Sequence, residues 1–159
     1  MYEYNCKIVK IVDGDTVDVD IDLGFGMWLR NERVRVHGID TPESRTRDKV
    51  EKVFGLAAKR FVQQVLPKGS SQTLVTEKPG DESKGKFGRI LGKFKIYDAK
   101  TDSWDFMGNI MIREGHAVAY SGQNKDDVQE QHLANRQKLL ESGFVSKEEY
   151  DAAAGKTAK

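Results

Sequence analysis

The sequence of 159 residues contains one cysteine, Cys6, and three prolines. A single cysteine excludes an intramolecular disulfide, a cysteine-based zinc site and a two-cysteine redox motif, so a metal would be held by oxygen atoms or by the three scattered histidines. A strong excess of one charge is also lacking, because 26 Lys and Arg nearly balance 25 Asp and Glu and leave a net charge of +1. Any anionic partner must therefore be held by a local patch rather than by bulk charge.

Long apolar runs are missing as well. No apolar stretch reaches the length of a membrane span, and the N-terminus lacks the basic start and apolar run of a secretory signal. We therefore expect no membrane partner and a cytoplasmic location, unless a precursor segment has been removed. With 38% apolar and 32% charged residues, the length suits one domain, which we assign to residues 1–145 of a monomer. Residues 146–159 are expected to be a C-terminal tail, either a short helix or disordered.

Runs of β-branched residues predict short strands. Residues 16–23 alternate strictly and place Val17, Val19, Ile21 and Leu23 on one face. The same reasoning predicts strands over 7–12, 16–23, 33–39, 72–77 and 88–97. We expect the segment from Gly24 to Glu32, with Trp28, to be a loop that packs on the strands, because large aromatic side chains are usually buried.

A change of apolar period to three and four predicts a helix over about 50–65, where Asp48 and Glu51 resemble a capping box. Further helices are expected over 106–114, capped by Gly115, and over 128–141, and a polar surface loop over 78–86. The third helix has a thin apolar stripe of Val128, Leu133 and Leu140. Five strands with a helix between the third and fourth indicate an α+β, mainly β fold, a five-stranded OB-fold barrel with about three flanking helices.

Five aspartates and no Lys or Arg lie between residues 13 and 22, an acidic density that suits a hard cation. Three of them alternate along a strand and are most simply a solvated polar face. An EF-hand is excluded, because counting from Asp13 puts Gly24 rather than Glu at the twelfth position. Asp15, beside the Gly14 turn, is the better candidate ligand.

The segment 34–44 crowds Asp40, Thr41 and Glu43 around a proline at a strand end. Taken alone, this pattern is equally a turn and a helix-start signal. Arg35 changes the balance, because it lies on the non-core face of the same strand and could bring a guanidinium group to two carboxylates at one end of the barrel.

The segment 84–95 carries five cations and no acid: Lys84, Lys86, Arg89, Lys93 and Lys95. A basic strand is usually a solvated face, but Phe87 and the glycines beside Arg89 suit the close approach of a phosphate backbone. Together the three stretches contain what phosphodiester hydrolysis needs: carboxylates for a divalent cation, a carboxylate near a water and two arginines.

Five segments resemble the staphylococcal nuclease, or thermonuclease, family in order and spacing from about residue 8 to 141: IVDGDTV (11–17), VRVHGIDTPES (34–44), KFGRILG (86–92), GNIMIREGHAVAY (108–120) and EQHL (130–133). The resemblance implies an OB barrel with three helices that hydrolyses DNA and RNA with one calcium ion, for which Mg²⁺ is a candidate substitute, and leaves 3′-phosphate ends. It implies that Asp15 and Asp40 are carboxylate ligands and that Thr41 is a ligand through its backbone carbonyl.

The resemblance also implies the catalytic groups. Glu43 matches the carboxylate that activates or positions the attacking water, and Arg35 and Arg89 match the two arginines that bind the scissile phosphate. The positions that contact the nucleotide are Lys86, Tyr120 and Phe87, the last standing where the family's reference member has tyrosine.

Other interpretations have less support. A general-base role for His37 is redundant with Glu43, zinc is disfavoured because His116 and His132 share no ligand spacing with the acids, and the methionines at 107 and 111 suit core packing. The rival function is a non-catalytic OB-fold module that binds single-stranded nucleic acid or protein. A calcium-binding structural protein would explain the acids but not the arginines.

Overall fold

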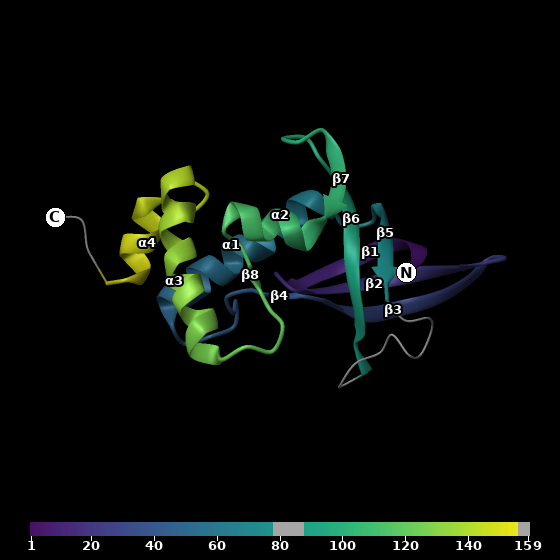
Figure 1. Ribbon diagram of the computed structural model, residues 1–159, viewed down its shortest axis with the longest axis horizontal. Helices are drawn as coiled ribbons and strands as arrows, with labels where there is room; N and C mark the ends of the chain where they lie inside the picture. The colour runs from purple at the N-terminus through teal and green to yellow at the C-terminus, as the bar shows by residue number, and fades with distance from the viewer. Residues whose placement is uncertain (78–87, 156–159) are drawn as a thin grey trace.

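The computed structural model describes residues 1–77 and 88–155 (Figure 1). The loop expected over 78–86 and the candidates Lys86 and Phe87 lie outside the described residues. In chain order the elements are β1 (Tyr2–Asp13), β2 (Thr16–Gly24), β3 (Met27–Val36), β4 (Ile39–Asp40), α1 (Lys49–Val65), β5 (Ser71–Thr76), β6 (Ile90–Asp98), β7 (Ser103–Phe106), α2 (Met107–Glu114), β8 (Val118–Ala119), α3 (Lys125–Ser142) and α4 (Lys147–Ala153).

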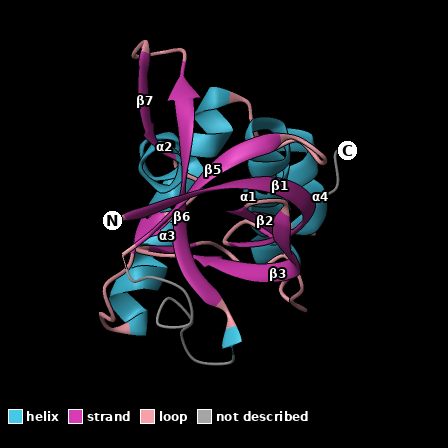
Figure 2. Cartoon of the chain, turned by 90° about the vertical axis from the view of Figure 1, so that its right-hand side faces the viewer, coloured by secondary structure: helices cyan, strands magenta, loops and turns pink. Residues whose placement is uncertain are grey.

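Five strands close into a ring. β3, β2, β1, β5 and β6 are antiparallel neighbours in that order, and β6 returns to β3 through a parallel pairing in which Arg35 lies opposite Leu91. β7 extends the sheet beyond β6, and β4 pairs with β8 in a separate ribbon. Figure 2 shows the strands crossing one another around the ring. The mainly β architecture with a five-stranded barrel is confirmed.

The ring encloses the main core because alternate residues of its strands turn inward. The strand residues buried there, as expected, include Val17, Val19, Ile21, Val34 and Val36. Helix α2 adds Met107 and Met111 to the same core, and both are fully buried, which confirms their packing role.

Helix α1 begins at the expected cap, where the Asp48 side chain accepts hydrogen bonds from the backbone N–H groups of Val50 and Glu51, both at 3.1 Å. Its buried face has the expected period and comprises Phe54, Gly55, Ala57, Ala58 and Val62. Helix α2 ends at Gly115 in the left-handed conformation, φ 88°, also as expected.

Helix α3 differs from the expectation in its start and in its buried face. It begins at Lys125, because the Asn124 side chain caps the N–H of Asp126 at 2.7 Å. The buried positions are Val128, His132 and Leu139, whereas Leu133 is 49% exposed, so the predicted stripe is wrong by one residue over the middle of the helix. Beyond it, α4 packs on α1 through an edge-to-face contact of Tyr150 with Phe54, at 6.1 Å between ring centroids.

The expected loop from Gly24 to Glu32 is wrong. β3 begins at Met27, so most of that segment pairs with β2 in a long hairpin that Figure 1 shows projecting from the barrel. Because this hairpin extends past the core, Leu23 is 44% exposed rather than inward. Trp28 is half-buried against the sheet, with Arg30 5.0 Å from its ring centroid.

Two other strand boundaries differ. The strand expected over 33–39 ends at Val36, because the chain turns at Gly38 with φ 86° before β4. The strand β7 (Ser103–Phe106) stands where only a turn and the start of a helix were expected. None of the helices in the two described ranges combines the length and apolarity needed to cross a membrane.

Candidate active site

Three of the sequence candidates line one groove. Arg35 at the end of β3, Arg89 just before β6 and Tyr120 just after β8 all contribute to its wall, as does exposed His37. The parallel pairing of β3 with β6 brings the two arginines to the same end of the ring, and the backbone N–H of Tyr120 donates to the carbonyl of Gly38 at 2.8 Å. Asp15, Asp40, Thr41 and Glu43 are not among the described residues that line this groove.

The Arg35 guanidinium is held in a fixed orientation at the groove. Nη1 donates to the carbonyl oxygen of Val36 at 2.5 Å, and Nη2 donates to that of Ile39 at 2.8 Å. The Asp15 carboxylate lies 3.5 Å from Nη2, and both side chains are 17% exposed. Arg35 thus joins the groove to the acidic turn after β1.

The turn at residues 13–15 lies directly against the segment 39–41. The Asp15 carbonyl accepts a hydrogen bond from the N–H of Val36 at 2.8 Å, which fixes the turn to the end of β3. A Cβ atom on Gly14 would lie 2.8 Å from the Ala58 Cβ and 3.1 Å from the Thr41 hydroxyl, so glycine permits the approach. The Thr41 hydroxyl is buried and has no hydrogen-bond partner in the part of the chain that the structure describes.

Asp40 is contacted by a histidine that the sequence analysis sets aside. His132 Nε2 lies 2.8 Å from Asp40 Oδ2, and the His132 side chain is 7% exposed. The contact fixes helix α3 to strand β4, where Asp40 also pairs with Val118. The 92-residue separation explains why spacing along the chain gives no sign of it.

Glu43 is exposed and follows the buried residues Thr41 and Pro42. Its backbone lies against α1: a Cβ on Gly55 would fall 2.3 Å from the Glu43 carbonyl oxygen and 2.6 Å from the Ser44 nitrogen. The pKa of the Glu51 carboxyl group on that helix is raised. The main cause is burial, and the second is the negative charge of Glu43. Gly55 thus permits the close approach of α1 to the 43–44 peptide, a contact that the helical period of the sequence does not reveal.

The remaining aspartates of the acidic run are engaged elsewhere. Arg33 donates two hydrogen bonds to the Asp18 carboxylate, at 2.9 and 3.2 Å. Asp18 is buried, so its expected place on a solvated face is wrong. Asp20 accepts from Arg30 and from the backbone of Asn31, which lower the pKa of Asp20, the backbone bond most strongly.

The donor set suits a hard cation. Asp40 directly precedes Thr41, and the turn that carries Asp15 lies against Thr41 through Gly14. Among the described residues, the buried Thr41 hydroxyl has no hydrogen-bond partner. No three His, Cys, Asp or Glu side chains gather into a metal cage within residues 1–77 and 88–155. Calcium would therefore draw on these two carboxylates together with backbone carbonyl and water oxygens, a mixture that it accepts.

His116 is a buried ring packed between aromatic side chains. It is 2% exposed and stacks on Phe61 at 4.8 Å between ring centroids, with Phe144 edge-on at 4.4 Å. Burial lowers the pKa of His116 from 6.5 to about 4, so the ring is neutral near neutral pH. It is a core residue.

Comparison with known proteins shows that the chain is similar to one protein family. The family model described as "Staphylococcal nuclease homologue" matches residues 33–142, more than half of the chain, a stretch that includes Arg35 and Arg89 while Asp15 precedes it. The chain is 31% identical to the micrococcal nuclease of Shigella flexneri over 121 residues, 74% of this chain and 59% of that protein.

Two further relatives share a lower identity with this chain. Endonuclease YhcR of Bacillus subtilis is 26% identical over 136 residues, 80% of this chain and 10% of that protein. An uncharacterized protein of Methanocaldococcus jannaschii is 28% identical over 133 residues, 74% of this chain and 59% of that protein. The chain thus spans less than two thirds of the length of each of these three relatives.

Proposed function

This chain belongs to the staphylococcal nuclease family, and from that premise we propose that it is a calcium-dependent nuclease that hydrolyses phosphodiester bonds of DNA or RNA with little sequence specificity and leaves 3′-phosphate ends. The observation that supports the proposal best is the groove in which Arg35 and Arg89 meet, with the Asp15 carboxylate 3.5 Å from Arg35. A module that merely binds nucleic acid has no chemical need for that combination of groups.

In this proposal Arg35 and Arg89 bind the scissile phosphate. Negative charge on the phosphate increases in the transition state, and preorganised guanidinium groups stabilise it because they need not reorient as the reaction proceeds. The hydrogen bonds from Arg35 to the Val36 and Ile39 carbonyl oxygens supply that preorganisation.

Glu43 is the proposed carboxylate that positions or deprotonates the attacking water. Its exposed side chain is reachable by water, while Gly55 allows α1 to hold its backbone closely. A group used in this way benefits from a fixed backbone, because a displacement of about 1 Å can lower a rate about 100-fold.

The proposed calcium ligands are Asp15, Asp40 and the Thr41 carbonyl. His132 orients the Asp40 carboxylate through its contact with Oδ2. When bound, the ion would neutralise phosphate charge. Tyr120, in the groove wall, is the proposed contact for a nucleotide, together with Lys86 and Phe87.

The test is cleavage of labelled single- and double-stranded DNA and RNA by the purified protein with calcium, magnesium or a chelator. Arg35→Ala should lower kcat about 100-fold or more, because a preorganised donor to the transition state is lost. Glu43→Gln should retain metal and oligonucleotide binding but slow hydrolysis by a similar factor.

Matched surface changes, Lys147→Ala and Glu130→Gln, control for the loss of one charge, since both residues are exposed. Calcium-dependent cleavage lost in the two site variants and kept in the controls supports the proposal. Binding without metal-dependent cleavage by the unaltered protein would instead favour the OB-fold binding module.

A further inference from the structure

The outward face of β6 carries cations and aromatic rings beyond the groove. Because side chains alternate along a strand, the residues from Arg89 to Tyr97 at every second position share one face. They are Arg89, Leu91, Lys93, Lys95 and Tyr97. Arg89 and Leu91 line the groove, and Tyr97 lies at the far end of the strand, about 26 Å from Arg89 at the usual rise per residue.

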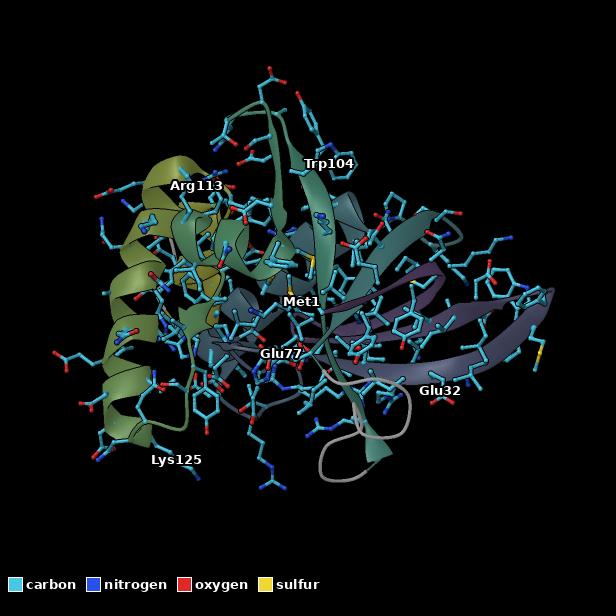
Figure 3. The ribbon with its side chains drawn as sticks, turned by 45° about the vertical axis from the view of Figure 1, so that its right-hand side comes forward. Met1, Glu32, Glu77, Trp104, Arg113 and Lys125 are labelled. Carbon is cyan, nitrogen blue, oxygen red and sulfur yellow. The ribbon has the colours of Figure 1, made fainter. Side chains whose placement is uncertain are left out.

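Two exposed rings stand at that far end. Tyr97 and Trp104 face each other across the β6–β7 hairpin, edge to face, with 5.9 Å between ring centroids. They are 49% and 65% exposed, although large aromatic side chains are usually buried. Asp102 accepts a hydrogen bond from the Tyr97 hydroxyl and so fixes its ring. Figure 3 shows Trp104 at the rising hairpin, away from the helices.

Two lysines, Lys93 and Lys95, lie along β6 between the groove and this aromatic pair. Lys93 Nζ lies 5.1 Å from the centre of the Phe106 ring, and Lys95 pairs directly across the strands with Phe106. Lys95 forms an ion pair with Glu3 at 3.3 Å, but both side chains are about half exposed and the pair is therefore weak. A phosphate can replace the Glu3 carboxylate as the partner of Lys95.

We propose that the β6 face, made of Lys93, Lys95, Tyr97, Trp104 and Phe106, binds a single strand of nucleic acid and leads it into the arginine groove. This inference rests on the proposed function of the groove. The alternation of cations with aromatic rings matches the two chemical features of such a strand, its phosphates and its unpaired bases. A duplex hides the base faces, so the aromatic pair discriminates in favour of single strands.

The experiment measures binding by the full-length chain in chelator, using the fluorescence anisotropy of a labelled DNA strand of about 10 nucleotides, which at stacked spacing exceeds the length of the face. Trp104→Ala should raise Kd about fivefold or more, the loss typical of one stacked base. Lys93→Ala with Lys95→Ala should reduce the slope of log K against log salt by about 1.4, because two phosphate contacts are lost. Duplex affinity should be insensitive to Trp104→Ala.

Phe25→Ala and Lys147→Ala are the matched controls, since both residues are exposed and lie on the other hairpin and on α4. If Kd for the single strand is the same in all variants, the β6 face is not the binding path and the inference is refuted. A second arm adds calcium and follows cleavage. If the protein cleaves nucleic acid in calcium but Trp104→Ala leaves Kd unaltered, the inference about the β6 face is refuted and the proposed nuclease function is not. If Trp104→Ala raises Kd but the unaltered protein does not cleave, the binding surface is supported and the proposed nuclease function is refuted.

Discussion

Replacing Gly55 by alanine should impair catalysis through a backbone contact. The new Cβ would fall 2.3 Å from the Glu43 carbonyl oxygen, and ordinary contact begins at 3.4 Å, so the 43–44 peptide and α1 must separate by about 1 Å. A displacement of that size at a catalytic group corresponds to about a 100-fold loss of kcat. Alanine favours the helix by about 1 kcal/mol and overpacking opposes it by about 1–3 kcal/mol. Because the atoms that the new Cβ meets are backbone, the free energy of unfolding should fall by about 2 kcal/mol or more.

The assay combines steady-state cleavage of a single-stranded substrate in calcium with urea unfolding of the same preparation. Gly108→Ala is the matched control, because it is the same change in helix α2 and its Cβ would meet the Cγ2 methyl group of Ile39 at 3.1 Å, which requires a shift of a few tenths of an ångström rather than about 1 Å. Gly108→Ala should keep kcat within about threefold. A folded Gly55→Ala protein with unaltered kcat would show that the close approach of α1 does not position Glu43.

Three further outcomes are expected. Burial lowers the pKa of His116 from 6.5 to about 4, so the unfolded chain takes up the proton first and the free energy of unfolding falls as the pH drops below 6.5. Between pH 7 and pH 5, urea unfolding should show that the unaltered protein loses about 2 kcal/mol more than the His116→Phe variant, and equal losses would refute this. His132→Ala should weaken calcium binding about 10-fold or more in substrate-free calorimetry, because Asp40 loses its partner; unaltered affinity would remove His132 from the site. Gly115→Ala should lower the melting temperature through a loss of about 1–2 kcal/mol at a positive φ, and an unaltered melting temperature would contradict that strain.

Local patterns predicted the elements whose burial follows one period. The strict alternation of β2 and the three-and-four spacing of α1 each bury the face that the sequence indicated, because a single core covers each of them along most of its length. The pattern failed where an element leaves the core. Leu23 obeys the alternation but lies on the projecting hairpin, and Leu133 obeys the helical period but lies on an exposed face of α3.

Contacts between distant segments could not be predicted from spacing. His132 meets Asp40 across 92 residues, and Gly55 meets Glu43 only because α1 folds back over the segment that precedes it. In both cases the sequence held a signal of the right kind, a histidine in a helix and a glycine in a buried helical face, but the contact partner is a property of the tertiary fold.

The near-neutral composition hides a separation of charge that strand register creates. In the pairing of β2 with β3, Arg33 lies opposite Asp18, whereas Arg35, two residues along the same face, lies opposite Thr16. Arg33 is therefore neutralised by its cross-strand partner, and Arg35 is left to the carbonyl groups at the strand end and to Asp15. A register shift of two residues would place Arg35 opposite Asp18 and Arg33 opposite Asp20, so that a cross-strand carboxylate would face both arginines. The placement of positive charge at the groove thus depends on strand register, which the net charge of +1 does not report.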